Sequence, residues 1–178
     1  MRASHVIKTV TLGLGLAVGL SIHDAAAQQQ NCIDTLAGMP DYSRFVNAVT
    51  MASMGNDVRN LQNITIFAPN NAAVAAVAPD MVDRLFPRQA GGGGREPDPI
   101  LASAAVQAHV VQGRLPVAAL AAGASGRTLA GTALSAAATQ GEPSVTLTTG
   151  QGVTAKIVQP NIACANGVIQ GIDRVLIR

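Results

Sequence analysis

The chain has 178 residues, with 12 Lys and Arg against 10 Asp and Glu, two cysteines, no Trp, one Tyr and three Phe. This length suits about one globular domain, and 48% hydrophobic against 12% charged residues argues against an intrinsically disordered chain. A net charge of only +2 and so few aromatic rings argue against a nucleic-acid binder, which needs a basic surface and side chains on which bases stack.

The N-terminal segment, residues 1–27, has the pattern of a secretory signal peptide. Arg2 and Lys8 form a basic start, residues 10–22 are a short apolar run, and three consecutive alanines supply small residues for cleavage. A membrane anchor is the alternative, but it needs about 20 apolar residues, and this run is shorter and interrupted by glycines. We therefore expect a secreted mature chain of residues 28–178, periplasmic or extracellular, with no integral membrane segment.

Apolar residues at helical spacing predict several helices in the mature chain, preceded by an extended lead-in over residues 28–40. The expected helices are 41–52 behind an Asp41 cap, an alanine-rich stretch opened by Asn70 or Asn71, 79–86, 99–108, and a short one after Pro116. Residues 55–57 are expected to end the first of these helices.

Short alternating or β-branched runs separated by Gly, Pro or Asn predict the strands. They are expected at 64–67, 110–111, 128–134, 144–149, 153–158, 162–164, 168–170 and 174–177. Because helices concentrate in the first half and strands in the second, the order indicates an α+β fold with an antiparallel sheet. Asn166 and Gly167 tolerate positive φ, so they are expected to form a type I′ hairpin turn.

Residues 88–99 contain four consecutive glycines followed by Arg95-Glu96-Pro97-Asp98-Pro99. Neither a helix nor a strand accommodates this composition, so we expect a mobile surface loop. A phosphate-binding loop would end in Gly-Lys-Ser or Gly-Lys-Thr, which is absent here.

Cys32 and Cys164 are the only cysteines. In an oxidising compartment they favour a disulfide, and two unpaired thiols are the alternative because the sequence does not fix their geometry. A zinc site is not expected, since the mature chain adds only one histidine, His109, at no zinc-ligand spacing.

Three segments, taken in order, resemble the fasciclin (FAS1) domain family. They are Thr-Ile-Phe-Ala-Pro-Asn-Asn-Ala-Ala-Val at 65–74, His-Val-Val-Gln-Gly-Arg-Leu at 109–115, and Ala-Asn-Gly-Val-Ile-Gln-Gly-Ile-Asp-Arg-Val-Leu at 165–176. The resemblance covers essentially all of the mature chain. It implies one FAS1 domain over residues 28–178, with helices packed on a predominantly antiparallel β-sheet wedge.

The sequence departs from the family pattern at four positions. Ala108 stands where the family has the tyrosine tied to adhesion proposals, Gln112 replaces a proline, Val74 an aromatic residue and Gln170 a histidine. These departures argue against recognition through a Tyr-His patch and are all tolerable for the fold.

Five polar residues are the candidates for interaction or structural roles. They are His109, Asn70, Asn71, Asn166 and Asp173. His109 is either an acid-base or adhesive group or a buried, hydrogen-bonded side chain at a helix-to-strand junction, and the absence of a neighbouring nucleophile or metal ligand favours burial. Asp173 is either a hydrogen-bond acceptor beside the core or a catalytic carboxylate, and no second carboxylate or histidine lies near it in sequence.

Two smaller patterns have ordinary explanations. Asn63-Ile64-Thr65 matches an N-glycosylation site, but we interpret the match as fortuitous because Thr65 is expected in a core strand. The serines lie in no Gly-x-Ser-x-Gly turn, and only His109 could serve as their base, which makes a hydrolase the weakest hypothesis.

The first functional hypothesis is a secreted, non-enzymatic module without a cofactor, which mediates adhesion or contacts with an extracellular protein, a carbohydrate or a cell-surface component. The alternative is an exported carrier of a small apolar ligand, because helices rich in Ala and Val can leave an apolar cavity beside the sheet.

Overall fold

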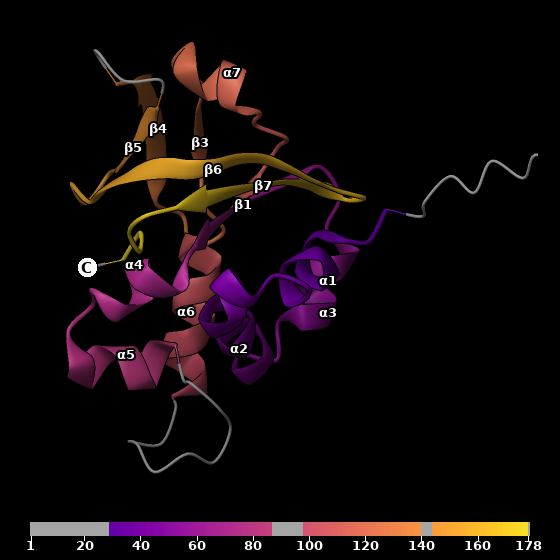
Figure 1. The fold of residues 1–178 in the computed structure, drawn as a ribbon, viewed down its shortest axis with the longest axis vertical. Helices are drawn as coiled ribbons and strands as arrows, with labels where there is room; N and C mark the ends of the chain where they lie inside the picture. The colour runs from indigo at the N-terminus through magenta and orange to yellow at the C-terminus, as the bar shows by residue number, and fades with distance from the viewer. Residues whose placement is uncertain (1–28, 87–97, 140–143, 178) are drawn as a thin grey trace, which may run out of the picture.

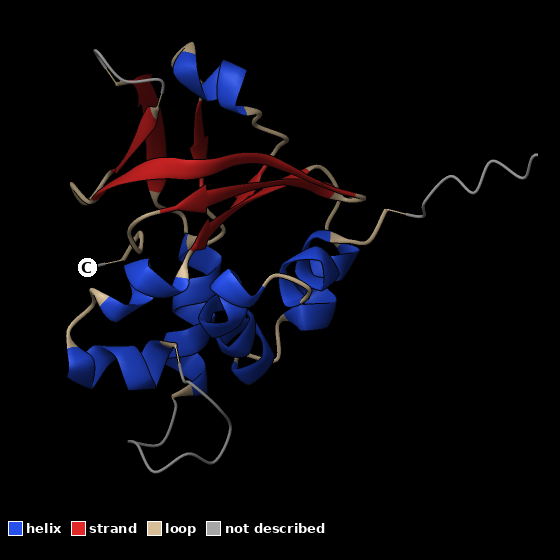
Figure 2. Cartoon of the chain, viewed as in Figure 1, coloured by secondary structure: helices blue, strands red, loops and turns tan. Residues whose placement is uncertain are grey.

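The computed structural model describes residues 29–86, 98–139 and 144–177. Figures 1 and 2 show the helices on one side of the molecule and the strands on the other, with α7 alone beyond the sheet. The α+β architecture with a mostly antiparallel sheet is therefore confirmed. The signal peptide and most of the loop at 88–99 lie outside the described residues and stay predictions.

The helical part is assembled from short elements. They are α1 (Cys32–Ala37), the 3-10 turn η1 (Pro40–Tyr42), α2 (Ser43–Met51), α3 (Gly55–Asn60), α4 (Asn71–Ala75), α5 (Pro79–Leu85), α6 (Pro99–Ala108) and α7 (Val117–Ala121). Among the described helices, none combines the length and the hydropathy that crossing a bilayer requires.

Three expectations about the first helices are wrong. The lead-in expected to be extended over residues 28–40 contains a helix, because Asn31 accepts a hydrogen bond from the Asp34 amide at 3.0 Å and so starts α1. Asp41 is not a cap: it lies within η1, and α2 begins after it with no side-chain cap. Gly55 begins α3 instead of ending α2.

The other helix predictions are confirmed, including the asparagine that opens α4. Asn70 accepts from the Ala73 amide at 2.7 Å and opens α4. Asp98, the last residue before α6, accepts from the amides of Ile100 and Leu101. Each cap satisfies backbone donors that the first turn of a helix leaves unpaired.

The described part of the chain contains one sheet of seven strands, in the order β2-β1-β7-β6-β5-β4-β3. They are β1 (Ile64–Pro69), β2 (Val110–Gln112), β3 (Ser125–Arg127), β4 (Ala133–Ala138), β5 (Val145–Thr149), β6 (Thr154–Cys164) and β7 (Gly167–Ile172). Only β1 and β7 run parallel to each other, while the other pairs are antiparallel.

Four strand predictions need correction. Residues 128–134 are not one strand, because the Thr128 amide donates to the Thr132 carbonyl at 2.9 Å and turns the chain between β3 and β4. The runs at 153–158 and 162–164 belong to the single strand β6. Residues 174–177 join no ladder, although Val175 and Leu176 are buried.

The long strand β6 gives the sheet its bent shape. Its first part pairs with β5 and its last part with β7, and its register shifts on both sides of Gln159. The two ends of the sheet then meet, because Val111 of β2 forms a bridge with Thr128 and the Leu129 amide donates to the Val110 carbonyl at 2.8 Å. The strands thus fold back on themselves into a wedge.

Two hydrophobic cores result from this arrangement. The larger core lies between the helices and the β1–β7 part of the sheet and includes Tyr42, Phe45 and Phe86. The smaller one lies between the two halves of the sheet, around Phe67 and Leu147. Leu120 of α7 belongs to the smaller core, so this helix closes the open end of the wedge.

The Asn166-Gly167 turn is not type I′, because neither residue has positive φ. Ala165 and Asn166 form the turn between the paired residues Cys164 and Gly167. Gly167 is required for a different reason: a Cβ there would overlap the Ile64 carbonyl oxygen of β1. The glycine thus serves the close approach of two central strands rather than a backbone conformation.

Candidate functional site

His109 ends α6 immediately before β2 and is completely buried. Its Nδ1 lies 2.6 Å from the Ala105 carbonyl oxygen, and its Nε2 accepts a hydrogen bond from the Leu176 amide at 2.9 Å. Because a carbonyl only accepts and an amide only donates, the imidazole is neutral with its proton on Nδ1. Both ring nitrogens are therefore used in joining α6 to the C-terminal segment.

The surroundings of His109 also favour the neutral ring. The edges of Phe45 and Phe86 meet it at centroid distances of 5.7 and 6.3 Å. Burial lowers the pKa of His109 to about 4 by disfavouring the charged form, and the bond to the Ala105 carbonyl offsets this only in part. The structure thus agrees with the buried interpretation of His109, and the ring has no free nitrogen with which to act as a base.

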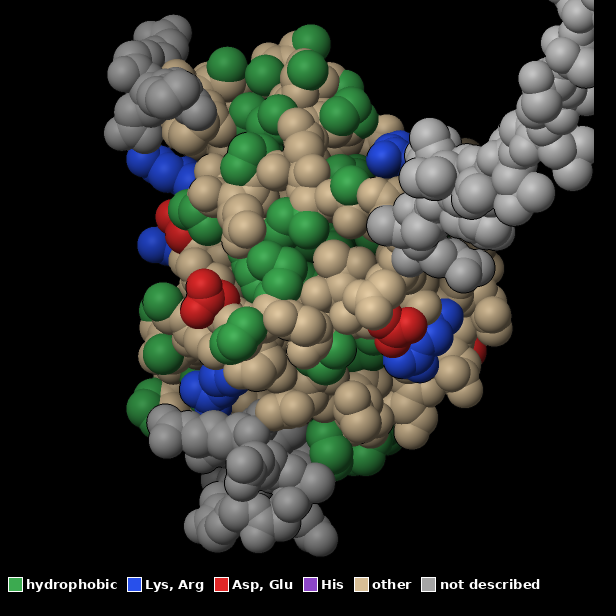
Figure 3. All heavy atoms as spheres, turned by 45° about the vertical axis from the view of Figure 1, so that its right-hand side comes forward, with side chains coloured by type: hydrophobic (Ala, Val, Ile, Leu, Met, Phe, Trp, Pro, Cys, Tyr) green, Lys and Arg blue, Asp and Glu red, His purple; other side chains and the backbone are tan. Residues whose placement is uncertain are grey.

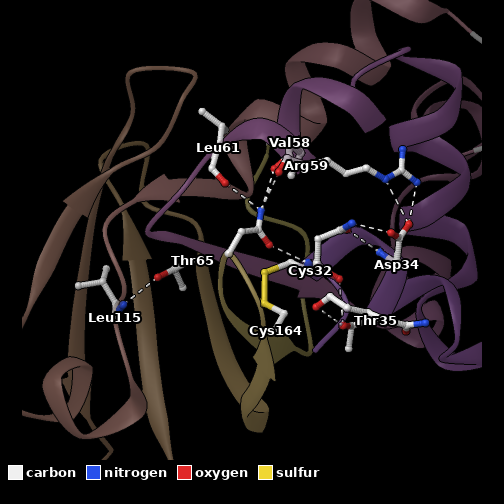
Figure 4. Close-up of a disulfide and its surroundings, with 12 residues drawn as sticks. Cys32, Asp34, Thr35, Val58, Arg59, Leu61, Thr65, Leu115 and Cys164 are labelled. Carbon is white, nitrogen blue, oxygen red and sulfur yellow. Dashed lines mark hydrogen bonds and ion pairs between the residues drawn. A yellow bond between two sulfur atoms is a disulfide. The ribbon is translucent and has the colours of Figure 1, made fainter. Parts of the chain in front are cut away.

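Cys32 and Cys164 form a disulfide, with their Cα atoms 4.9 Å apart (Figure 4). The bond joins the first residue of α1 to the last residue of β6, across 132 positions of sequence. The favoured pairing is confirmed, and it fastens the N-terminal helix to the sheet.

Asn166 strengthens the same junction. Its Oδ1 accepts from the Cys32 amide at 2.9 Å, and its Nδ2 donates to the carbonyls of Val58 at 3.0 Å and Leu61 at 2.9 Å. One buried amide therefore joins the start of α1, the end of α3 and the β6–β7 turn. A side chain with the same donors and acceptors is needed there, because unsatisfied buried groups are costly.

An ion pair on the surface also joins α1 to α3. Arg59 of α3 contacts Asp34 of α1 at 2.7 Å. The hydrogen bond from Arg59 lowers the pKa of Asp34 below its usual value. Both side chains are well exposed, so this pair adds little to stability.

The remaining candidates also hold backbone groups. Asn71 accepts from the Arg44 amide at 3.1 Å and donates to the Pro40 carbonyl at 2.9 Å, which joins α4 to α2. Asn70 caps α4. Asp173 accepts from the Lys156 amide at 2.7 Å, as expected of a backbone acceptor, but it is exposed rather than beside the core.

Sequence reasoning missed a polar cluster around Gln170, which it noted only as a replacement for a family histidine. Gln170 is fully buried in β7, accepts from the Asn161 amide at 2.9 Å, and donates to the Leu115 carbonyl at 3.0 Å and to Asn161 Oδ1 at 3.1 Å. Asn161 Oδ1 also accepts from the Val117 amide at the start of α7. The only signal in the sequence was a glutamine inside an apolar strand.

Thr65 is a second buried polar residue: the sequence placed it in a core strand but did not predict its hydrogen bonds. Its hydroxyl donates to the Gly113 carbonyl at 2.6 Å and accepts from the Leu115 amide at 2.8 Å. Thr65 is fully buried in β1, in agreement with the interpretation of Asn63-Ile64-Thr65 as a fortuitous match.

The structure does not bring the candidate residues together. Ser103 donates to the Met54 sulfur at 3.4 Å rather than to His109. Within residues 29–86, 98–139 and 144–177, no group of three His, Cys, Asp or Glu side chains is placed to hold a metal ion. Each candidate instead holds backbone groups in place, so these polar side chains stabilise the scaffold.

The chain belongs to the fasciclin domain family, whose model matches residues 40–178. The fold is also similar to part of a FAS1 domain pair from the insect cell adhesion molecule fasciclin I, with a TM-score of 0.57 at 21% identity. That likeness covers 74% of this chain but only 43% of the insect structure. A comparison with curated proteins gave no match.

Proposed function

We propose that this protein is exported and acts outside the cytoplasm as a non-enzymatic FAS1 module that mediates adhesion or contacts with extracellular molecules. The observation that carries the proposal is the FAS1 fold combined with buried His109 and Asn166 side chains whose hydrogen bonds all go to backbone groups. Membership in a family that includes an insect cell adhesion molecule supports it further.

The surface offers room for such contacts. On the face shown in Figure 3, hydrophobic side chains gather over the middle, where sheet and helices meet, and charged side chains are few and stand mostly near the margins. One domain is a weak binder by itself, so we expect adhesion to depend on many copies presented together.

The test is attachment of the producing cells, or of their extracellular matrix, to beads coated with the mature protein. Beads coated with protein that was reduced and alkylated in denaturant are the control, because alkyl groups on the buried Cys32 and Cys164 prevent the same sequence from refolding. Equal attachment to both kinds of bead would refute the proposal. The intact mass of the protein tests whether it is exported, since the exported protein should have the mass of a chain that starts at Gln28.

A carrier of a small apolar ligand is the second candidate. The feature that favours it is an open hollow of about 390 Å³ at α6, lined by Pro99, Ile100, Ser103, Ala104 and Gln107. Ile100 is 80% exposed there, which is unusual for a large apolar side chain. Native mass spectrometry of protein purified from its own host would reveal a bound ligand, and an apo mass would count against a carrier.

A further inference from the structure

The part of the sheet formed by β3, β4, β5 and β6 has an outer face that neither core covers. Along these strands, inward residues such as Leu134, Leu147 and Ala155 are buried, and the residues between them point outward. We call this outward side the outer face.

A row of hydroxyl groups crosses the outer face. Ser125 of β3 lies opposite Ser135 of β4, Ser135 lies opposite Thr148 of β5, and Thr148 lies opposite Thr154 of β6. All four residues are exposed. Because neighbouring strands are about 4.8 Å apart, the row presents four hydroxyls at a regular spacing across the sheet.

A charged hollow lies at the β6 end of this row. It has a volume of about 150 Å³ and is lined by Thr146, Thr154, Ala155, Lys156, Asp173 and Arg174. Its lining thus includes two basic residues and one acidic residue, and the Asp173 carboxylate accepts from the Lys156 amide. The hollow is smaller than a pocket for a whole drug-sized ligand and suits one polar group of a longer molecule.

The charges of the protein are divided unequally between a helical half, residues 29–109, and a strand half, residues 110–178. Residues 29–109 contain five basic and seven acidic residues, whereas residues 110–178 contain five basic and two acidic ones. In the helical half, Arg59 pairs with Asp34 and Arg84 with Asp98.

The arginines of the strand half differ from those of the helical half in their ion pairing. Arg114, Arg127 and Arg174 are exposed, and none makes an ion pair with any residue that the structure describes. Arg127 stands on β3 at one side of the outer face, and Arg174 lines the hollow at the other. The outer face therefore has positive charge at both margins and suits an anionic partner.

We propose that the outer face binds an acidic polysaccharide, a chain of sugars that carry carboxylate groups, with one carboxylate in the hollow beside Lys156 and Arg174. Ser and Thr hydroxyls both donate and accept, as sugar hydroxyls do, and guanidinium groups pair well with carboxylates. A nucleic acid fits less well, because the outer face has no aromatic residue on which a base could stack. This inference rests on the proposed function and names the class of its partner.

Isothermal titration calorimetry with the mature protein tests this binding. The probe is polygalacturonate, and its fully methyl-esterified form is the control because it keeps the sugar backbone and loses the charge. We expect polygalacturonate to bind, the ester to bind at least about tenfold more weakly, and added salt to weaken the charged interaction. Equal binding of both polymers, or tighter binding of duplex DNA than of polygalacturonate, would overturn the proposal.

Variants locate the site. The double variant Arg127→Gln/Arg174→Gln should bind polygalacturonate about five- to tenfold more weakly, because two exposed charge contacts are lost. Arg84→Gln on α5 makes the same kind of charge change in the helical half and should bind like the parent protein. If both substitutions weaken binding equally, the polymer does not recognise the outer face.

The hydroxyl row has its own test. Ser135→Ala/Thr148→Val removes two hydroxyls and keeps charge and shape, so binding should weaken about fivefold with an unchanged salt dependence. Thr50→Val, on helix α2, is the matched control. Unchanged affinity in the hydroxyl variant would refute the role of the row. If the parent protein does not bind polygalacturonate but the coated beads still attach, this inference is refuted and the proposed function stands.

Discussion

The neutral, buried ring of His109 predicts a specific dependence of stability on pH. The unfolded chain binds a proton at this ring below about pH 6.5, whereas the folded protein binds it only below about pH 4. Between these values the unfolded state holds more protons, so stability is complete above pH 6.5 and is lost as the pH falls toward 4. The gap corresponds to about 3 kcal/mol in full and to about 2 kcal/mol between pH 7.5 and pH 5.

Urea denaturation at pH 7.5 and at pH 5 measures this loss. His109 is the only histidine of residues 28–178, so a His109→Gln variant removes the histidine contribution and leaves the carboxylates to titrate as before. We expect the variant to be less stable at pH 7.5, because the bonds to Ala105 and Leu176 change, but to lose about 2 kcal/mol less than the parent protein on going to pH 5.

Two results would refute this reasoning. One is an equal loss of stability on acidification in the parent protein and in His109→Gln. The other is an NMR titration of the folded parent protein that shows the His109 ring binding a proton near its ordinary pKa of 6.5. The NMR measurement needs no substitution, so it decides the question even if the variant does not fold.

Three further predictions concern the scaffold, each measured as the free energy of unfolding by urea denaturation. Gly167→Ala should cost about 2–3 kcal/mol because the added Cβ overlaps the backbone of β1. Gly38 is the control: its φ is negative and an added Cβ would make only ordinary contacts, so Gly38→Ala should change stability by less than about 1 kcal/mol. Removing the disulfide with Cys32→Ser/Cys164→Ser should cost about 3–5 kcal/mol, since the bond closes a span of 132 residues, and an unchanged value would mean that the thiols are unpaired in solution. Asn166→Asp turns an amide donor into a carboxylate that faces two carbonyls, and should cost about 3 kcal/mol; a neutral result would contradict the observed hydrogen bonds.

The sequence predicted the elements that have strong local signals. The helix 99–108 has a proline at its start and an aspartate cap before it, and β1 has four consecutive β-branched or aromatic residues before Ala68 and Pro69. Both elements therefore appear with nearly the expected bounds. The segment Cys32–Ala37 was missed because a six-residue helix shows little periodicity, although Asn31 followed by Asp34 was a local cap signal.

The wrong strand at 174–177 has a tertiary cause. Val175 and Leu176 are buried, so their pattern was that of a strand, but no neighbouring strand pairs with them. The Leu176 amide finds its acceptor in the His109 ring, 67 positions earlier in the chain. Local sequence carries no information about such a partner, and the same holds for Asn166, whose role depends on residues of α1 and α3.

The division of charge follows from how the two halves are built. Helices bring aspartates and arginines from different elements side by side, as in the pairs Arg59–Asp34 and Arg84–Asp98, so their charges are neutralised within the molecule. On the outer face alternate residues must turn to solvent, and here they are mostly small or hydroxylated, with Arg127 and Lys156 toward the margins. Arg114, Arg127 and Arg174 of the strand half make no ion pair with any residue that the structure describes, so their positive charge is available for a partner. This is why we expect charge substitutions on the outer face to change binding, and the same substitutions on the helices to leave binding unchanged.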